Sequence, residues 1–371
     1  MIDVRPATGP TSIELADGRP ADLTTVDDTS AVVHVTQPDG GVETIVVDGL
    51  EPDTDHELAV ADTTIRVRTL PTPAGELRCT FTTVNDVHFG EVVAGLIEGF
   101  DGGPLRSAEP GAEPYPEVMN RSAVTDMRRI EPTAVIVKGD LSVDGTDEEW
   151  AAFERCYRDS FGDTLHVVRG NHDAYRHQTS YAGDAVVDLP GIRLAVIDTT
   201  IPGSTTGMIT DDQATWLRDV GDHDGAVLVL GHHQQWVGQA SDPSDPGSQR
   251  RSDDYFGIHP DGSDRLDAVC VDRPSIIGYT AGHTHRHRRR EMTASGRPTV
   301  EIGCTKDFPG TWAEYRVYDG GVMQVVHRIS APEALRWSES CRHLYADVGV
   351  DYAAYALGEL SDRCFVVTID E

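Results

Sequence analysis

The segment Gly170-Asn171-His172-Asp173 directly follows the apolar run Leu165-His166-Val167-Val168, and this junction decides the fold prediction. A short β-rich run that ends abruptly in Gly-Asn predicts a buried strand with polar side chains at its carboxyl end. In open α/β sheets, ligands bind at that end of the strands. Because Gly-Asn is also an ordinary turn, the tetrapeptide alone does not define a site.

Four other apolar runs end in the same way. These endings are Asp86-Val87-His88 after residues 80–84, Gly139-Asp140 after 134–137, Gly231-His232 after 226–230, and Gly282-His283-Thr284-His285 after 275–279. A core strand has no structural need to finish in aspartate, histidine or asparagine. Five such endings in one chain therefore predict a shared site at one edge of an α/β domain, whose strand, loop and helix pattern repeats from Glu76 onward.

Aspartate, histidine and asparagine, with no cysteine among them, suit divalent metals of intermediate hardness such as manganese, iron or zinc. With one carboxylate shared, these residues fit two ions about 3.5–4 Å apart, which bind a hydroxide between them and neutralise the charge of a phosphate. The pattern therefore predicts phosphoryl-transfer chemistry by positioning and electrostatics.

The order Asp-x-His, Gly-Asp, Gly-Asn-His-Asp, Gly-His and Gly-His-x-His resembles the calcineurin-like metallophosphoesterase family between Leu77 and Arg328. The resemblance implies an α/β (α+β) fold, a two-sheet αββα sandwich with the metals at the strand tips. It also implies a ligand set. Asp86, His88 and His285 would hold the first metal, Asp140 would bridge both, and Asn171, His232 and His283 would hold the second.

The same resemblance gives His172 the role of an unliganded proton donor that also stabilises the phosphate, with Asp173 orienting its imidazole. Two departures from the family pattern bear on the assignment. Gln234 stands where the family often has a proline, which leaves His233 as an alternative beside His232. Val143 replaces the tyrosine of purple acid phosphatases, and His88 is a histidine that they lack, so we exclude that subfamily.

The resemblance is greatest to the soluble bacterial cyclic-nucleotide phosphodiesterase branch. It implies a hydrolase that cleaves a small phosphate ester by attack of the metal-bridging hydroxide, with a phosphodiester as the expected substrate. A phosphomonoesterase or a nucleotide pyrophosphatase is the enzymatic alternative. A metal-binding scaffold with decayed activity is the non-enzymatic one, and the presence of a ligand at every motif argues against it.

Residues 1–72 differ from the rest of the chain. Short alternating runs separated by turn signals such as Asp39-Gly40-Gly41 predict a small all-β sandwich. Residues 49–60 resemble the strand-turn-strand corner of fibronectin type III modules. After a Pro-Thr-Pro linker, we expect a catalytic domain at 76–330. A tail at 331–371 should contain one or two helices and a last strand over Cys364–Ile369.

The formal net charge is −31, which argues against binding of a nucleic-acid polymer, since that requires a basic surface. No apolar stretch approaches the roughly 20 residues of a membrane span. The first residues lack the features of a signal peptide, so we expect a cytoplasmic protein. The six scattered cysteines predict thiols, with a Cys341–Cys364 bridge as the alternative.

Three helices and two loops are also predicted. Capping-box patterns at Thr146 and Thr210 mark two helix starts, and a longer helix is expected over Pro116–Arg129. The polar loop 234–262, which contains Arg250, Arg251 and His259, is either a lid over the site or a disordered surface. Residues 287–290 are expected to form a solvated basic turn, with a phosphate clamp as the alternative.

Overall fold

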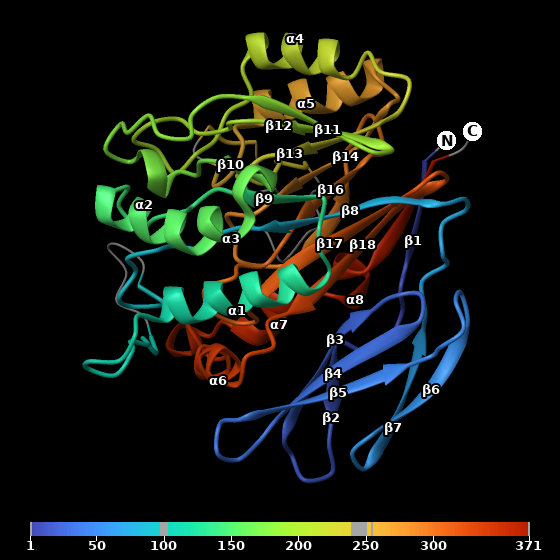
Figure 1. Ribbon diagram of the computed structural model, residues 1–371, viewed down its shortest axis with the longest axis vertical. Helices are drawn as coiled ribbons and strands as arrows, with labels where there is room; N and C mark the ends of the chain where they lie inside the picture. Colours follow the sequence, from blue (N-terminus) through green and yellow to red (C-terminus); the bar gives the residue numbers. More distant parts are fainter. Residues whose placement is uncertain (1, 97–102, 239–250, 254, 370–371) are drawn as a thin grey trace.

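Two large β-sheets lie face to face in the computed structural model, which describes residues 2–96, 103–238, 251–253 and 255–369 (Figure 1). The first has seven strands in the order β1-β19-β18-β17-β8-β9-β10, and the second has six in the order β11-β12-β13-β14-β16-β15. The strands of the first are β1 (Ile2–Pro6), β8 (Leu77–Val84), β9 (Ala134–Lys138), β10 (Leu165–Val168), β17 (Thr311–Tyr318), β18 (Gly321–Arg328) and β19 (Phe365–Ile369). The strands of the second are β11 (Ala185–Leu189), β12 (Ile192–Val196), β13 (Ala226–Leu230), β14 (Ile276–Ala281), β15 (Arg288–Glu291) and β16 (Pro298–Glu301).

Alternate residues of these strands build two different cores. Ile136 of β9 packs between the sheets, where Phe81 and Tyr315 stack with ring centroids 4.6 Å apart. Its neighbours Val135 and Val137 face the helices outside. Because both faces of the central strands are covered, these strands are continuous apolar runs rather than alternating ones.

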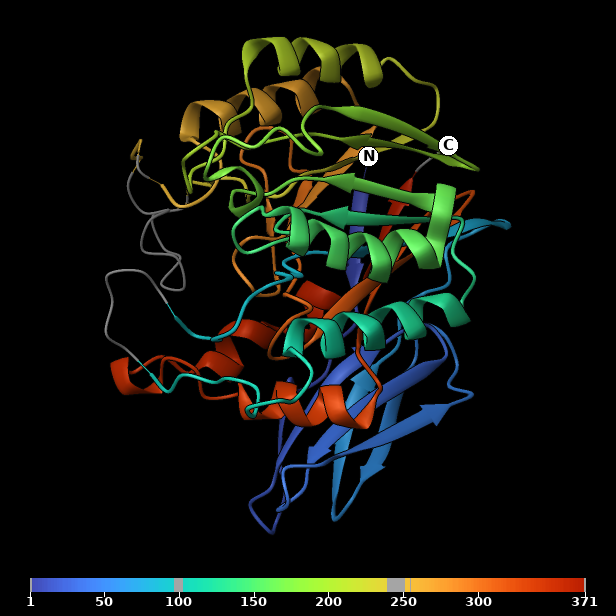
Figure 2. The same cartoon turned by 60° about the vertical axis from the view of Figure 1, so that its left-hand side comes forward.

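Helices cover both outer faces, as the views in Figures 1 and 2 show. The seven-stranded sheet carries α1 (Tyr115–Arg129) and α2 (Asp147–Phe153), which continues through a π-helical turn (Glu154–Arg158), α3 (Asp159–Phe161) and a 3-10 turn (Gly162–Thr164). The six-stranded sheet carries α4 (Asp211–Val220) and α5 (Pro260–Asp272). Both predicted capping boxes are present, at Thr146 and Thr210. The αββα sandwich is therefore confirmed.

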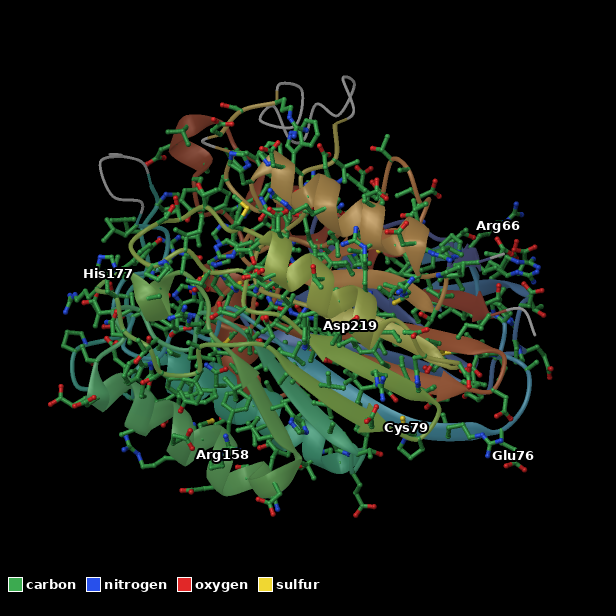
Figure 3. All side chains as sticks on the ribbon, turned by 90° about the horizontal axis from the view of Figure 1, so that it is seen from above. Arg66, Glu76, Cys79, Arg158, His177 and Asp219 are labelled. Atoms are coloured by element: carbon green, nitrogen blue, oxygen red, sulfur yellow. The ribbon has the colours of Figure 1, made fainter. Side chains whose placement is uncertain are left out.

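Strand direction brings the predicted site residues to one end of the sandwich. Strands β8, β9 and β10 run parallel in one sheet, and β12, β13, β14 and β16 run parallel in the other. In Figure 3, Glu76 and Cys79, where β8 begins, lie at the end opposite to His177, which follows β10. The carboxyl ends of the parallel strands thus share one edge.

The N-terminal region forms two small antiparallel sheets at one side of the sandwich (Figure 1). One contains β2 (Ser12–Glu14), β3 (Pro20–Val26), β4 (Ser30–Thr36) and β5 (Val42–Asp48), and the other contains β6 (Asp55–Val60) and β7 (Thr63–Arg68). The predicted all-β character of this region is confirmed. The fibronectin type III likeness of residues 49–60 stays a prediction.

The two ends of the chain lie together in the large sheet. Strand β19 pairs with β18 on one side and with β1 on the other, both antiparallel. The first strand of the predicted sandwich range and the last strand of the predicted tail thus extend the seven-stranded sheet. Alternating patterns locate strands but do not say which sheet they join, because pairing partners are set by tertiary packing.

The C-terminal region is more helical than expected. It contains α6 (Pro332–Ser340), a 3-10 turn (Ala346–Val348), α7 (Tyr352–Leu357) and α8 (Leu360–Arg363) before β19. All six cysteines are free thiols, so Cys341 and Cys364 form no bridge. None of the helices in the described part combines the length and the apolar character that a bilayer crossing requires.

The small sheets share their core with the large domain. Buried Leu23 and Val33 belong to the same cluster as Met323 of β18 and Val366 of β19. Ion pairs join the same surfaces. Arg342 contacts Asp22 of β3, and Arg316 of β17 lies 3.0 Å from Asp27 and 3.2 Å from Asp28. We therefore expect the N-terminal region to unfold with the rest of the chain.

Leu23→Ala tests this shared core. We expect it to lower the free energy of unfolding by about 2–5 kcal/mol, because a fully buried leucine leaves a cavity. All five tryptophans lie beyond residue 72, so their fluorescence reports the larger part of the chain, whereas circular dichroism reports both parts. The two signals should change together in denaturant. Val46→Ala, at an exposed position of β5, is the control. A dichroism transition that precedes the fluorescence transition would show separate unfolding.

Candidate metal centre

The seven predicted metal ligands lie together at the carboxyl ends of five strands. They follow β8 (Asp86, His88), β9 (Asp140), β10 (Asn171), β13 (His232) and β14 (His283, His285). All are buried except His285, which is partly exposed. Their arrangement supplies overlapping groups of donor atoms within 4.8 Å of one another, including Asp86-His88-His285 and Asp86-Asp140-His232.

Asp140 occupies the middle of this arrangement. Its Oδ2 lies 3.5 Å from His88 Nε2 and 3.3 Å from His232 Nε2, and its Oδ1 accepts a hydrogen bond from the backbone N–H of His172. Burial alone would raise the pKa of this carboxyl group, yet His232, followed by His172, holds the pKa well below its usual range. The group is therefore a carboxylate that faces histidines from both sides.

Asp86 organises one side of the centre. Its Oδ1 lies 3.6 Å from His285 Nε2, and both of its oxygens accept from the backbone N–H of His283, at 3.1 and 3.0 Å. Asn85 donates to its Oδ2 at 2.5 Å. These bonds tie the loop after β8 to the loop after β14, which lies in the opposite sheet.

His232 is oriented by the backbone. Its Nδ1 donates to the carbonyl of Lys138 at 2.9 Å, which directs Nε2 toward Asp140 and toward Asn171 Oδ1, 3.0 Å away. Such a bond fixes the tautomer and the ring plane of a metal-binding histidine.

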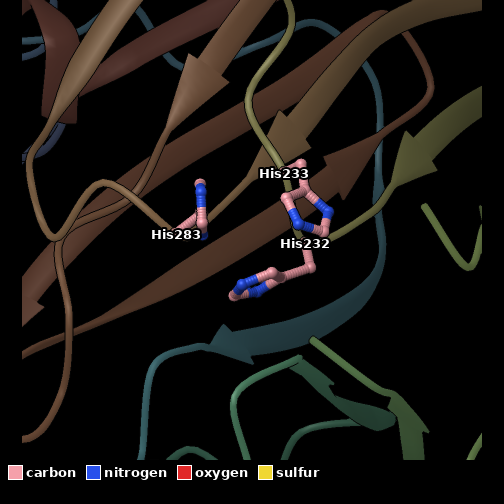
Figure 4. A group of neighbouring side chains, drawn as sticks. All are labelled: His232, His233 and His283. Atoms are coloured by element: carbon pink, nitrogen blue, oxygen red, sulfur yellow. The ribbon is translucent and has the colours of Figure 1, made fainter. Parts of the chain in front are cut away.

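Figure 4 shows that the imidazoles of His232, His233 and His283 gather from the loops after β13 and β14. Donor nitrogens of these three residues lie within 4.8 Å of one another. His233 bonds Thr199 Oγ1 through Nδ1 at 2.8 Å. It therefore remains beside His232 as an alternative ligand.

Several buried donor atoms here have no hydrogen-bond partner among the described residues. These are both ring nitrogens of His88 and Nε2 of His233 and His283. A buried polar atom without a partner costs about 1–3 kcal/mol. Burial also lowers the pKa of His88 and His283 well below the usual value, so both imidazoles are neutral, the form that binds cations. The residues therefore fit divalent metal ions.

The backbone of the centre is strained. Positive φ angles occur at Asp86 (52°), His88 (47°), Asp140 (50°), His283 (71°) and His285 (56°). These five are nearly half of the eleven non-glycine residues in that region of the Ramachandran plot among the described residues. Each such residue costs about 1–3 kcal/mol and persists only where the surroundings impose it. The concentration of this strain on the ligands marks a functional site independently of side-chain chemistry.

Gly139 shows why glycine precedes one of these ligands. Its φ of +85° is unfavourable for other residues, and a Cβ there would lie 2.5 Å from His232 Nδ1 and 2.8 Å from the backbone nitrogen of Gly170. The loops after β9 and β10 can approach each other only without a side chain. In the Gly-Asp motif, the glycine is thus required for packing and the aspartate for the chemistry of the site.

The expectation that Asp173 orients the imidazole of His172 is wrong. Asp173 accepts from the backbone N–H groups of Leu141, Ser142 and Gly170 and from the Ser142 hydroxyl. The imidazole of His172 instead donates from Nδ1 to the carbonyl of Val143 at 2.9 Å. The chain turns into a 3-10 helix (His172–Ala174) after Asn171, which directs Asp173 toward the loop after β9. Asp173 therefore links the loop after β9 to the loop after β10 by hydrogen bonds.

Residues 288–290 form part of strand β15 rather than a solvated turn, so that prediction is wrong.

Glu301 of β16 contacts the loop that carries His283 and His285. It accepts from Thr284 Oγ1 and Arg286 Nε, both at 2.9 Å, and pairs with Arg288 and Arg290. Sequence reasoning missed Glu301, because its position in a late apolar strand carries no motif.

Glu301→Gln should lower the free energy of unfolding by about 3–5 kcal/mol, since it removes the carboxylate from a buried ion cluster. The arginines hold the pKa of Glu301, despite its burial, well below the usual value. Its stabilisation is therefore complete above the ordinary glutamate pKa and declines as the pH falls below it. Denaturant unfolding at several pH values measures both effects. Glu57→Gln, which breaks an exposed pair with Arg66, is the control, and equal losses in both variants would contradict the assignment.

The loop 234–262 is only partly within the described residues. Arg250 lies outside them, and α5 already begins at Pro260. Arg251 pairs with Asp261 and Asp264 of α5, and His259 pairs with Asp253. Phe256 stacks on His283, with ring centroids 4.1 Å apart. One aromatic side chain of the loop thus contacts a candidate ligand, and the lid itself stays a prediction.

Residues 80–287, more than half of the sequence, match the calcineurin-like phosphoesterase family, so the chain belongs to this family. It is 28% identical over 183 residues to the 3',5'-cyclic adenosine monophosphate phosphodiesterase CpdA of Pseudomonas aeruginosa, covering 48% of this chain and 63% of that one. It is 32% identical over 116 residues to a probable cyclic nucleotide phosphodiesterase of Rhodococcus erythropolis, covering 27% and 38%. The chain thus spans less than two thirds of the length of either relative.

A dimetal phosphatase from Danio rerio shares the fold. Its crystal structure superimposes with a TM-score of 0.50 at 16% identity, over 69% of this chain and 98% of that one. The likeness in fold agrees with the two facing sheets and the flanking helices described above.

Proposed function

We propose that the protein is a dinuclear metal-dependent phosphodiesterase that hydrolyses a small phosphodiester. The observation that carries the proposal is the central carboxylate of Asp140, which faces His88 on one side and His232 on the other. Asp86, His88 and His285 with Asp140 supply one ligand set, and Asp140 with Asn171, His232 and His283 supplies the other. Manganese, iron or zinc suits this mixture of carboxylate, amide and imidazole donors.

When bound, two such cations activate water as a nucleophile and neutralise the charge of the phosphate. The protein itself provides charge, positioning of the ligands and a proton donor. Asp140 holds a negative charge, and the strained loops keep the imidazoles in place. Since Nδ1 of His172 donates to Val143, its Nε2 is the nitrogen that can deliver a proton to the departing alkoxide.

Two observations support a diester over a monoester or a pyrophosphate. The relatives from Pseudomonas aeruginosa and Rhodococcus erythropolis carry the names of cyclic-nucleotide phosphodiesterases. In addition, Lys306 is the one lysine or arginine among the described residues that line the cavity over the centre. It is held by Glu91 at 2.8 Å and by Asp307 at 2.9 Å. Apart from the metal ions, the cavity therefore offers little positive charge for a dianionic monoester or a second phosphate.

Turnover of bis(4-nitrophenyl) phosphate and of 4-nitrophenyl phosphate by the manganese-loaded protein tests this proposal. Both esters release the same phenolate. A difference in kcat/KM therefore reflects whether the enzyme prefers a phosphodiester or a phosphomonoester. We expect a higher kcat/KM for the diester. A higher kcat/KM for the monoester would replace the proposal with a phosphomonoesterase. Absence of turnover with two bound ions per chain would support a binding protein instead.

A further inference from the structure

The cavity over the metal centre is larger than a phosphate group requires. Its volume is about 1280 Å³, beyond the range of roughly 300–1000 Å³ that ordinary small-molecule pockets occupy. The candidate ligands line one side. Another part of the lining is apolar and aromatic, and its described residues include Leu96, Phe256, Tyr345, Val348, Val350 and Tyr355, which we call the apolar wall.

The apolar wall exposes side chains that proteins usually bury. Leu96 is 64% exposed, Phe256 51%, Val348 44% and Val350 39%. These four are among only ten large hydrophobic residues that are exposed in the described part of the chain. Apolar surface concentrated at one place on a protein marks a binding site more often than chance exposure does.

Hydrogen bonds and ring contacts hold the apolar wall in place. Tyr355 donates from its hydroxyl to the carbonyl of Thr284, between His283 and His285, at 2.9 Å. Tyr352 donates to Asp307 at 2.9 Å, and its ring packs against that of Tyr345, with centroids 5.4 Å apart. The segment that carries Val348 and Val350 is therefore tied to the ligand loop. A surface held in place in this way loses little entropy when a ligand binds.

The wall also begins at the reacting centre. The Phe256 ring stacks on the imidazole of His283, with 28° between the planes. A phosphate held by the ligands would lie next to this ring, so a group on one of its ester oxygens has the wall within reach. The only cationic lysine or arginine among the described lining residues, Lys306, is already paired with Glu91 and Asp307, so the group on that oxygen gains nothing from carrying negative charge.

We propose that the substrate is a phosphodiester in which one alcohol is a bulky, uncharged apolar group that packs on the apolar wall. This inference rests on the proposed phosphodiesterase function and names its substrate class. Hydrolysis forms a new P–O bond to the oxygen of water and breaks one ester P–O bond. A proton then passes to the departing alkoxide, giving an alcohol and a phosphomonoester.

A series of 4-nitrophenyl alkyl phosphates, with the alkyl chain lengthened from methyl to hexyl, tests the inference on the manganese-loaded full-length protein. The leaving group is the same throughout, so only the packing of the alkyl group changes. Each buried methylene should raise kcat/KM about two- to fourfold. Alkyl phosphonates of the same lengths should show a parallel fall in Kd by calorimetry.

Val348→Ser and Val350→Ser should each reduce the dependence on chain length in both measurements. Val271→Ser, at an exposed position of α5 outside the cavity, should keep it. Turnover that is independent of chain length in the unaltered protein would overturn the inference and leave the phosphodiesterase intact. A dependence that survives in both wall variants would also overturn it. No turnover of any diester would instead count against the proposed function.

Discussion

Asp140→Asn should leave the protein with little bound divalent metal and with phosphodiester turnover reduced on the order of 10²–10³-fold or more. The carboxylate is buried, and it faces His88 Nε2 and His232 Nε2 from one oxygen while the other holds the backbone of His172. A carboxamide has the same shape but no charge and one acceptor oxygen instead of two. It cannot bridge two cations.

Elemental analysis after manganese reconstitution measures this effect directly. The control is Asp188→Asn, at an exposed position of β11 that pairs with Arg193, and it should keep both ions and full turnover. Unfolding should be measured alongside, because removal of a buried charge that faces two histidines changes stability as well. Two ions per chain in the Asp140 variant would defeat the bridging role.

His172→Ala is expected to keep both metals while losing rate mainly on substrates with a poor leaving group. General acid catalysis is typically worth about 10²–10⁴-fold. That loss should appear on alkyl phosphate esters and shrink on nitrophenyl esters, whose leaving group needs little protonation. The structure supports the role, because the Nδ1 bond to Val143 leaves Nε2 for the site.

The same residue is also close enough to be a ligand, since a donor atom of His172 lies within 4.8 Å of donors of His88 and Asp140. Metal content therefore decides between the roles. Loss of an ion would make His172 a ligand, and an equal rate loss on both classes of ester would make it an electrostatic contact to phosphate. His177→Ala, in the exposed part of the same loop, is the matched control.

The positions of the candidate ligands could be predicted from the sequence because each is encoded locally. An apolar run, a glycine and a polar residue specify a strand, a tight turn and a side chain at the strand tip. Parallel strands bring their carboxyl ends to one edge, so Asp86 meets Asp140 in one sheet and His232 meets His283 in the other. The helix starts at Thr146 and Thr210 are equally local, since a capping box lies within four residues.

Features that depend on distant partners could not be predicted. Asp173 follows His172 in sequence, but the direction of its side chain is set by the backbone N–H groups of Leu141 and Ser142. Glu301 acts through arginines of the neighbouring strand β15. The apolar wall comes largely from Tyr345, Val348 and Val350, more than fifty residues after the last motif, and no local pattern links it to the site.

The most direct test of the central claim is anomalous diffraction from crystals of the manganese-reconstituted protein. The account predicts two anomalous peaks per chain about 3.5–4 Å apart. Both should lie within coordination distance of the Asp140 carboxylate, one toward His88 and His285 and the other toward His232 and His283. A single peak, or peaks that leave Asp140 unliganded, would contradict it.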